Sequence, residues 1–168
     1  MSMLEILKNH VPTENPEFGQ KKKLVGDAVA QIQSLAKITA KSGAEWVILK
    51  TEVIHAIPDA KGRETTVQPG DEITNVYNPT DAESIADLAN DLFTAGIEYS
   101  TNVADEDALM AAMSEAAKGK LIYWRTWAKD KTAEQIAKNP AKPSFFQNQV
   151  VKSKNLITPE NSVPTLPF

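Results

Sequence analysis

Aromatic and basic residues gather in one segment of the chain, residues 118–154. This segment holds five of the eleven Phe, Tyr and Trp residues, and nine Lys or Arg residues against two acids. Aromatic rings can stack on unpaired nucleic-acid bases, while cations hold the phosphates between those bases. The segment therefore favours binding of single-stranded nucleic acid. The purely structural alternative is a strand whose aromatic side chains are all buried.

Within this segment, residues 120–128 are predicted to form a β-strand. Successive side chains of a strand point to opposite faces of its sheet. Tyr123, Arg125 and Trp127 therefore share one face, in the order aromatic, cation, aromatic. Trp124 lies on the other face, between an isoleucine and a threonine, and is expected to belong to the core.

The net charge of −4 conceals a strong segregation of charge along the chain. Residues 64–117 carry twelve acids and no Lys or Arg, whereas residues 118–154 carry nine bases and two acids, a local balance of +7. Residues 20–63 add eight bases and four acids. Attraction of a polyanion depends on the local potential rather than on the total charge. An acidic chain of this kind can therefore still bind a nucleic acid through its basic segments.

Several classes of enzyme find no support in the sequence, and we expect a protein without catalysis, cofactor or metal. The chain has no cysteine, which excludes disulfides, thiolate metal sites and a cysteine nucleophile. No glycine-rich phosphate-binding motif is present. The two histidines, His10 and His55, are far apart in the sequence, which gives little basis for a zinc site or a catalytic triad.

Two alternative functions remain open at this point. A metal-dependent nuclease is the enzymatic alternative, because clustered carboxylates could hold Mg²⁺; the candidates are Asp71, Glu72, Asp105, Glu106 and Asp107. A structural or adaptor protein of a phage particle is the other, because Trp, Tyr and Arg are also enriched at protein interfaces.

Hydrophobic periodicity and turn residues predict the elements that must position the aromatic and basic surface. Apolar residues recur at helical spacing in residues 1–8 and in Leu24–Ala40, which predicts two helices. β-Branched and aromatic residues then predict strands over Glu45–Ile57, Arg63–Gln68 and Ile73–Tyr77, joined by short turns into a meander.

The C-terminal half is predicted to contain two helices and two further strands. Thr80 or Asp81 caps the first helix, Gly96 ends it, and the second helix covers about residues 105–118. Strands at 120–128 and 144–153 follow, with a helical turn at 132–138 between them.

This order of elements predicts an α+β, mainly β fold. A meander followed by helices between the third and fourth strands is the topology of a five-stranded OB-like barrel, here with an additional N-terminal helix. The alternative is another small α+β sheet domain with helices on one face. We expect an N-terminal helical segment (1–43), a barrel domain (44–154) and a flexible C-terminal tail (155–168), which has three prolines and no periodicity.

One sheet face of such a barrel, with its loops, would present the DNA-binding residues. The candidates come from the meander and from the aromatic and basic segment: Trp46, Lys50, Lys61, Arg63, Lys120, Tyr123, Arg125, Trp127, Lys129, Lys131, Phe145 and Lys152.

Over about Glu45–Lys154 the sequence resembles phage-type single-stranded DNA-binding proteins of the OB-fold class. The likeness consists of the element order, the entry Gly119-Lys120 into an aromatic and basic strand, and a closing strand that reads Phe-Phe-Gln-Asn-Gln-Val-Val. The last residues, Leu166-Pro167-Phe168, are similar to the Ile-Pro-Phe tip of bacterial single-stranded DNA-binding proteins. That family places a run of aspartates before its tip, whereas only Glu160 is near it here.

The resemblance implies a sequence-independent single-stranded DNA-binding protein for phage-type replication or recombination, in the host cytoplasm. The family tip binds partner proteins through its terminal Phe and carboxylate, so Leu166, Pro167 and Phe168 would bind a replication or recombination protein. Further copies of the chain are an additional partner to consider. The N-terminus does not resemble a signal peptide, and no apolar run approaches the length of a membrane helix, so a soluble protein is expected.

Overall fold

The computed structural model describes residue 4 and residues 22–164 of the chain. The chain divides into two compact units. The main unit contains Lys23–Ala128 and the residues from Gln147 onward, and a small unit contains Lys129–Phe146. The predicted helix at 1–8 and the tip Leu166–Phe168 lie outside the described residues, apart from Leu4.

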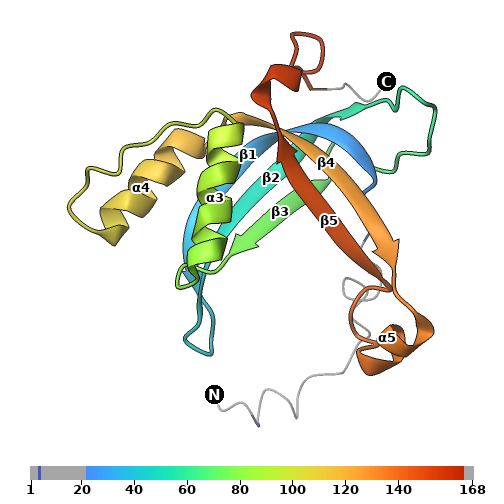
Figure 1. The fold of residues 1–168 in the computed structure, drawn as a ribbon, viewed down its shortest axis with the longest axis horizontal. Helices are drawn as coiled ribbons and strands as arrows, with labels where there is room; N and C mark the ends of the chain where they lie inside the picture. The colour runs from blue at the N-terminus through green and yellow to red at the C-terminus, as the bar shows by residue number, and fades with distance from the viewer. Residues whose placement is uncertain (1–3, 5–21, 165–168) are drawn as a thin grey trace. The chain divides into compact units, whose positions relative to one another are not determined.

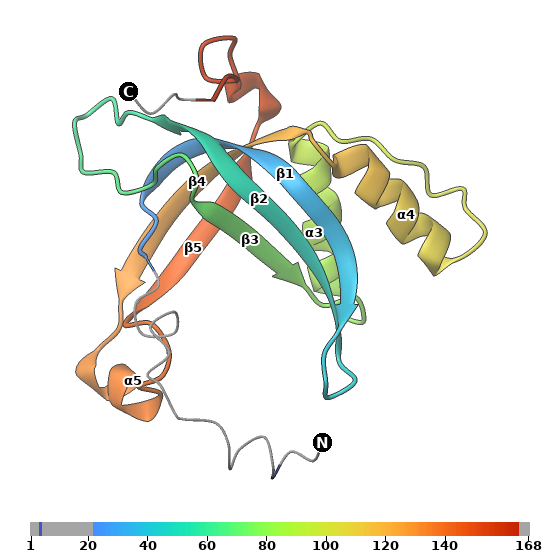
Figure 2. The ribbon, with the colours of Figure 1, turned by 180° about the vertical axis from the view of Figure 1, so that it is seen from behind.

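A five-stranded antiparallel sheet, curled into a half-barrel, organises the main unit (Figures 1 and 2). The hydrogen-bonded order of its strands is β3-β2-β1-β4-β5. The strands are β1 (Gly26–Thr39), β2 (Glu45–Ile57), β3 (Glu72–Tyr77), β4 (Leu121–Asp130) and β5 (Phe145–Lys152). Such a curled sheet is consistent with an OB-like barrel.

Strand β1 stands where a helix was predicted, and that prediction is wrong. Leu24–Ala40 were expected to be helical, but Gly26–Thr39 form a strand between β2 and β4 in the centre of the sheet. The pairing of β1 with β2 changes register after Val29 and again after Ile32. Each irregularity interrupts the two-residue alternation of a strand. The apolar residues therefore recur at spacings of three and four, which imitate a helix.

The predicted strand at Arg63–Gln68 is also absent from the sheet, because these residues form an extended loop. The Thr66 N–H donates to the carbonyl oxygen of Val25 at 2.9 Å, as in a sheet. The Val25 N–H, however, donates to the Thr66 hydroxyl at 3.0 Å instead of to a carbonyl. A side-chain acceptor of this kind competes with the backbone ladder and ends it. The meander therefore consists of β1, β2 and β3, one strand earlier in the chain than predicted.

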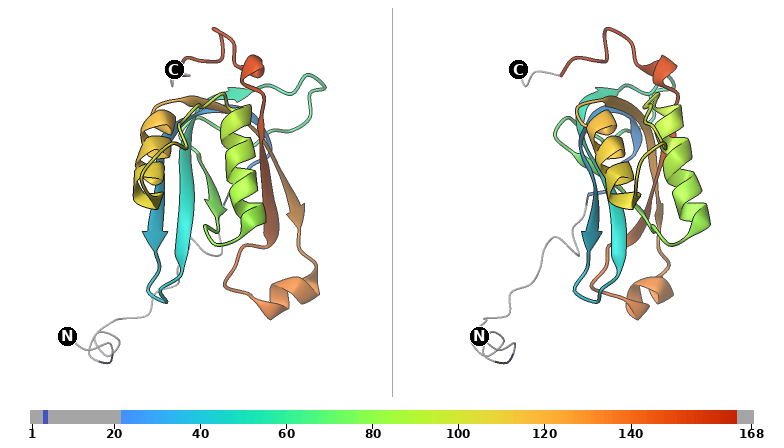
Figure 3. Two further views of the ribbon diagram at one scale, coloured as in Figure 1. Left: turned by 60° about the vertical axis from the view of Figure 1, so that its left-hand side comes forward. Right: turned by 90° about the vertical axis from the view of Figure 1, so that its left-hand side faces the viewer.

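Two helices connect β3 to β4, and both agree with the predicted ranges. They are α3 (Ala82–Thr94) and α4 (Glu106–Ala117). The side chain of Asp81 caps α3, and the side chain of Asp105 caps α4 by accepting the Ala108 N–H at 2.8 Å. Helix α3 lies along β3 and helix α4 along β1 (Figure 3). In the small unit, α5 (Ala133–Lys138) follows a capping box at Thr132.

The core of the main unit lies inside the curl of the sheet and under the helices. Trp124 on β4 is fully buried there, as the strand alternation predicts. Its indole Nε1 donates to the hydroxyl of Thr51 at 3.0 Å, and this hydroxyl donates to the carbonyl oxygen of Ile73 at 2.7 Å. The chain of hydrogen bonds satisfies two buried polar side chains and connects β4, β2 and β3 through the core.

Side chains also connect the two edge strands, β3 and β5. Gln149 on β5 donates from Nε2 to the carbonyl oxygen of Thr74 at 2.5 Å and to Asn75 Oδ1 at 2.8 Å. Asn75 and Tyr77 donate in turn to the carboxylate of Asp91 on α3, at 3.5 and 2.5 Å. Burial raises the pKa of Asp91, although these hydrogen bonds oppose the change. This polar network holds the open side of the half-barrel together.

Candidate nucleic-acid interface

A groove of about 730 Å³ opens in the main unit where β1 begins, β2 ends and β4 passes alongside. This volume lies in the range of small-ligand sites, about 300–1,000 Å³. The groove is therefore large enough for a ligand the size of a nucleotide. The lining residues are Val25–Asp27, Ile57–Lys61, Arg63–Thr65, Tyr123 and Arg125–Trp127.

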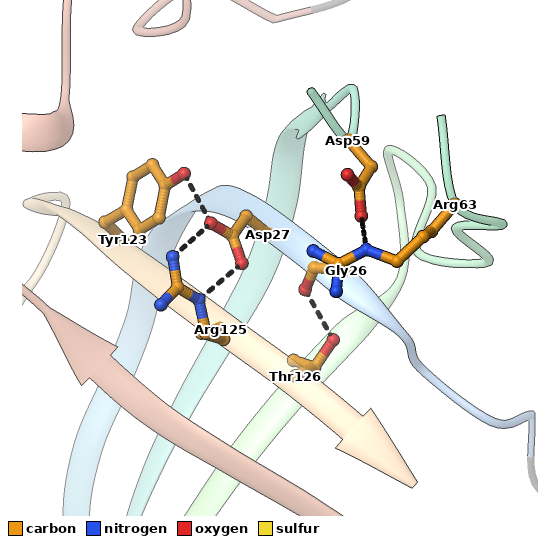
Figure 4. Close-up of polar contacts among 7 residues, drawn as sticks. All are labelled: Gly26, Asp27, Asp59, Arg63, Tyr123, Arg125 and Thr126. Atoms are coloured by element: carbon orange, nitrogen blue, oxygen red, sulfur yellow. Dashed lines mark hydrogen bonds and ion pairs between the residues drawn. The ribbon is translucent and has the colours of Figure 1, made fainter. Parts of the chain in front are cut away.

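A carboxylate, a guanidinium and a phenol form the fixed centre of this groove (Figure 4). Arg125 on β4 donates from Nε and from Nη2 to the two carboxylate oxygens of Asp27 on β1, both at 3.0 Å. The hydroxyl of Tyr123 donates to Asp27 Oδ2 at 2.8 Å. Asp27 faces Arg125 because the two residues are direct partners in the β1–β4 ladder. A two-pronged contact of this kind fixes the plane of the guanidinium.

The protonation states of this centre follow from the same contacts. Partial burial opposes ionisation of Asp27, but hydrogen bonds from Arg125 and Tyr123, with the charges of Arg125 and Lys152, hold the pKa of Asp27 below its usual value. Burial and the Asp27 carboxylate raise the pKa of the Tyr123 phenol. At neutral pH the centre therefore holds an ionised carboxylate, a charged guanidinium and a protonated phenol.

A second arginine enters the groove from the loop after β2. Arg63 Nε donates to Asp59 Oδ2 at 2.7 Å, and the backbone N–H of Lys61 donates to Asp59 Oδ1 at 2.7 Å. The side chain of Arg63 is 72% exposed and extends toward the start of β1 at Gly26 (Figure 4). Gly26 also lets the loop pack closely on the start of β1, because its φ is 123° and a Cβ there would lie 3.0 Å from Thr65 Cγ2.

Trp127 forms the rim of the groove and is 43% exposed. It shares the outward face of β4 with Arg125, two residues earlier. Its backbone is fixed by Gln147 on β5, whose Nε2 donates to the Trp127 carbonyl oxygen at 3.0 Å and to the Leu24 carbonyl oxygen at 2.8 Å. The Trp127 backbone is therefore anchored to β5, and its side chain is partly exposed to solvent.

The structure brings five of the predicted DNA-binding residues together in the groove: Lys61, Arg63, Tyr123, Arg125 and Trp127. Tyr123 is only 5% exposed and its hydroxyl is bonded to Asp27, so it positions the carboxylate and offers no open ring for stacking. The positive charge of Lys152 on β5 contributes to the lowered pKa of Asp27.

The other predicted residues lie elsewhere. Trp46 is the second residue of β2 and Lys50 lies near the middle of the strand, whereas the groove is at its last residue, Ile57. Trp46 and Ile57 are eleven positions apart, which is roughly 35 Å along an extended strand. Lys120 immediately precedes β4, at the end of that strand away from Trp127. The remaining three residues, Lys129, Lys131 and Phe145, belong to the small unit.

In the small unit, a cation and an exposed aromatic ring lie together. The Nζ of Lys131 is 4.9 Å from the ring centroid of Phe146, which is 45% exposed. Phe145, the aromatic that was predicted to contact DNA, is buried. The exposed aromatic of this pair is therefore Phe146, which was not among the predicted DNA-binding residues.

None of the three acids that line the groove, Asp27, Asp59 and Glu64, was identified as a site residue from the sequence. Asp27 was assigned to a helix, which hid its pairing with Arg125 across a sheet. The spacing of Asp59 and Arg63, four residues apart across a turn, was the one available signal of their ion pair.

The acids considered for a nuclease have structural contacts of their own. Asp71 accepts the Gln68 N–H at 2.8 Å and Glu72 pairs with Lys50 at 3.6 Å. Asp105 caps α4, and the two acids that follow it lie in the first turn of that helix. Within residues 22–164, no group of three or more His, Cys, Asp or Glu side chains is arranged to hold a metal ion.

The sequence matches no protein-family model and no curated protein. None of the helices in the described part of the chain is long and apolar enough to cross a membrane.

Proposed function

We propose that the protein binds single-stranded DNA without sequence preference and without catalysis, in phage-type DNA replication or recombination. The observation that carries this proposal is the groove in which two partly exposed arginines, a lysine and a half-exposed tryptophan converge on one rigid strand and its neighbouring loop. Stacking on Trp127 accepts any base, because every base has a π-face. The paired bases of a duplex do not offer that face.

The two arginines can each hold a phosphate while they remain bound to their carboxylates. Arg125 uses Nε and Nη2 for Asp27, and Arg63 uses Nε for Asp59. A guanidinium has five N–H donors, so several stay available on each side chain. The carboxylates therefore orient the arginines and still leave donors for phosphate oxygens.

The proposed fold family is the OB fold. The β1–β2–β3 meander, the pairing of β1 with β4 and the helices between β3 and β4 support it. In OB domains one sheet face and the connecting loops bind oligonucleotides. Here the groove lies on β4 and on the loop after β2, which is in keeping with that use.

A fluorescence titration with labelled oligo-dT tests the proposal. We expect binding that weakens as salt rises, with a slope of about −2 in a plot of log K against log salt if about three phosphates are held. The slope is moderate because Asp27 and Asp59 offset part of the positive charge of the groove. Cleavage of DNA that EDTA abolishes would favour the nuclease. No binding at low salt, with a stable assembly by size-exclusion chromatography, would favour the structural or adaptor protein.

The role of the C-terminal tip stays a prediction. A terminal Phe168 can fill an apolar pocket while its carboxylate meets a cation, which a Phe inside the chain cannot do. Removing residues 160–168 is expected to leave oligo-dT affinity nearly unchanged and to abolish capture of a replication or recombination protein. Phe168→Ala alone should cause most of this loss in a pull-down assay. Misfolding of the truncated protein, seen by circular dichroism, would contradict the prediction.

A further inference from the structure

The groove carries as many carboxylates as cations among its lining residues. The three cations and the three acids are Lys61, Arg63, Arg125, Asp27, Asp59 and Glu64. Their formal charges cancel, so the groove has little net positive potential with which to attract a polyanion. Binding in the groove must therefore depend on individual contacts, and each acid must be compatible with a ligand that carries phosphates.

Glu64 differs from the other two acids because it holds no arginine. Asp27 orients Arg125. Asp59 does the same for Arg63. The side chain of Glu64 is exposed, and it forms no hydrogen bond or ion pair with any residue that the structure describes. A carboxylate in this position repels phosphate, but its oxygens are available to accept hydrogen bonds from a ligand in the groove.

Glu64 and Trp127 line the groove from opposite sides of β1. The loop that contains Glu64 follows one side, since the Thr66 N–H donates to the Val25 carbonyl oxygen at 2.9 Å. Strand β4, which carries Trp127, follows the other side and pairs with β1 from Gly26 onward. Neighbouring strands lie about 4.8 Å apart, so the loop and β4 are separated by roughly 10 Å. A nucleotide that stacks on Trp127 therefore lies within reach of the Glu64 carboxylate.

Unpaired bases offer hydrogen-bond donors that paired bases do not. Each of the four bases has at least one N–H donor on its Watson–Crick edge: the ring N–H of thymine and guanine, or the amino group of adenine and cytosine. In a duplex these donors are bonded to the partner base. A carboxylate only accepts hydrogen bonds, so it can bind the free edge of any unpaired base. It also repels the phosphates of a duplex, which offers it no such edge in return.

We propose that Glu64 is a specificity-determining residue, which accepts a hydrogen bond from the Watson–Crick edge of the base stacked on Trp127. This inference rests on the proposed binding of single-stranded DNA. It adds to stacking a second cause for the preference for unpaired bases. Because every base offers a donor, the contact requires no particular sequence.

A chemically modified oligonucleotide tests the hydrogen bond directly. N3-methylthymine keeps the ring face and the phosphates of oligo-dT but lacks the N3–H donor. By fluorescence anisotropy, we expect the wild type to bind the methylated strand about fivefold or more weakly than oligo-dT of equal length. Glu64→Ala should bind the two strands equally, because the acceptor is gone. It should also bind a duplex of equal length more tightly than the wild type does, because the repulsion is gone.

Two further variants separate the hydrogen bond from the charge. Glu64→Gln keeps an acceptor oxygen without the charge, so it should still favour oligo-dT over the methylated strand and should bind the duplex more tightly. Glu98→Ala is the matched control, since Glu98 is an exposed glutamate that does not line the groove. It should leave all three affinities at the wild-type values.

Equal binding of oligo-dT and the methylated strand by the wild type would overturn the inference and leave the proposed function standing. The same holds if Glu64→Ala, shown by circular dichroism to be folded, still prefers oligo-dT as strongly as the wild type does. A wild type that binds no oligo-dT at low salt would instead contradict the proposed function, and the inference with it. The comparison of the two strands on the wild type decides even if Glu64→Ala fails to fold.

Discussion

Trp127→Ala is expected to weaken binding of oligo-dT by about 1–3 kcal/mol, which is roughly a 5- to 150-fold rise in Kd. The indole is 43% exposed at the rim of the groove and is the open aromatic side chain on the face it shares with Arg125. Its removal deletes the stacking platform and leaves the cations in place. The salt dependence should therefore change little while the affinity falls. Fluorescence anisotropy with labelled oligo-dT at several salt concentrations measures both quantities.

Trp46→Ala is the matched control for this substitution. It removes an indole of similar exposure, 37%, from the opposite end of β2. We expect the oligo-dT affinity of Trp46→Ala to equal that of the wild type. Equal losses in the two variants would mean that DNA contacts Trp46 on β2 as well as Trp127. An unchanged oligo-dT affinity in Trp127→Ala would show that bases do not stack on Trp127.

Trp124→Ala is expected to lower the free energy of unfolding by about 3–5 kcal/mol, the typical cost of truncating a fully buried large aromatic. Trp124 has no exposed surface, and its Nε1 donates to the buried hydroxyl of Thr51. The substitution opens a cavity and also deprives that hydroxyl of its donor. Urea unfolding followed by circular dichroism gives the change.

Two further variants separate the contributions in this second prediction. Trp124→Phe keeps most of the buried ring and loses the N–H donor, so it should cost less than the alanine variant. Phe93→Ala removes an aromatic ring that is 84% exposed, and its effect should stay within about 0.5 kcal/mol. A Trp124→Ala protein as stable as Phe93→Ala would mean that the assignment of the β4 faces is inverted.

The faces of β4 could be predicted from the sequence because the strand pairs with β1 without a register shift from Leu121 to Thr126. Alternation alone identified Trp124 as core and Arg125 and Trp127 as exposed, and the burial pattern of the strand agrees. Tyr123 is the exception to this agreement. Its side chain lies on the outward face but is covered, and its hydroxyl is bonded to Asp27. Strand alternation predicts the face to which a side chain points, but it does not predict whether other residues cover that side chain.

Strand β1 could not be predicted by the same reasoning, since two register shifts give its apolar residues a helical spacing. This error also concealed part of the site. The pair between Asp27 and Arg125 joins residues 98 positions apart and exists only because β1 lies beside β4. A local pattern cannot supply such a contact. The Asp59–Arg63 pair, in contrast, joins residues only four positions apart and could have been predicted from the sequence.

The most direct measurement of the central claim is a paired titration of the full chain with oligo-dT and with a DNA duplex of equal length, each at several salt concentrations. The groove predicts that the single strand binds at least about tenfold more tightly than the duplex, because only unpaired bases can stack on Trp127. It also predicts that the single strand still binds more tightly than the duplex as salt rises, since salt does not screen stacking. Equal affinity for the two forms, or binding that disappears completely at moderate salt, would contradict the claim and indicate simple attraction between phosphates and surface cations.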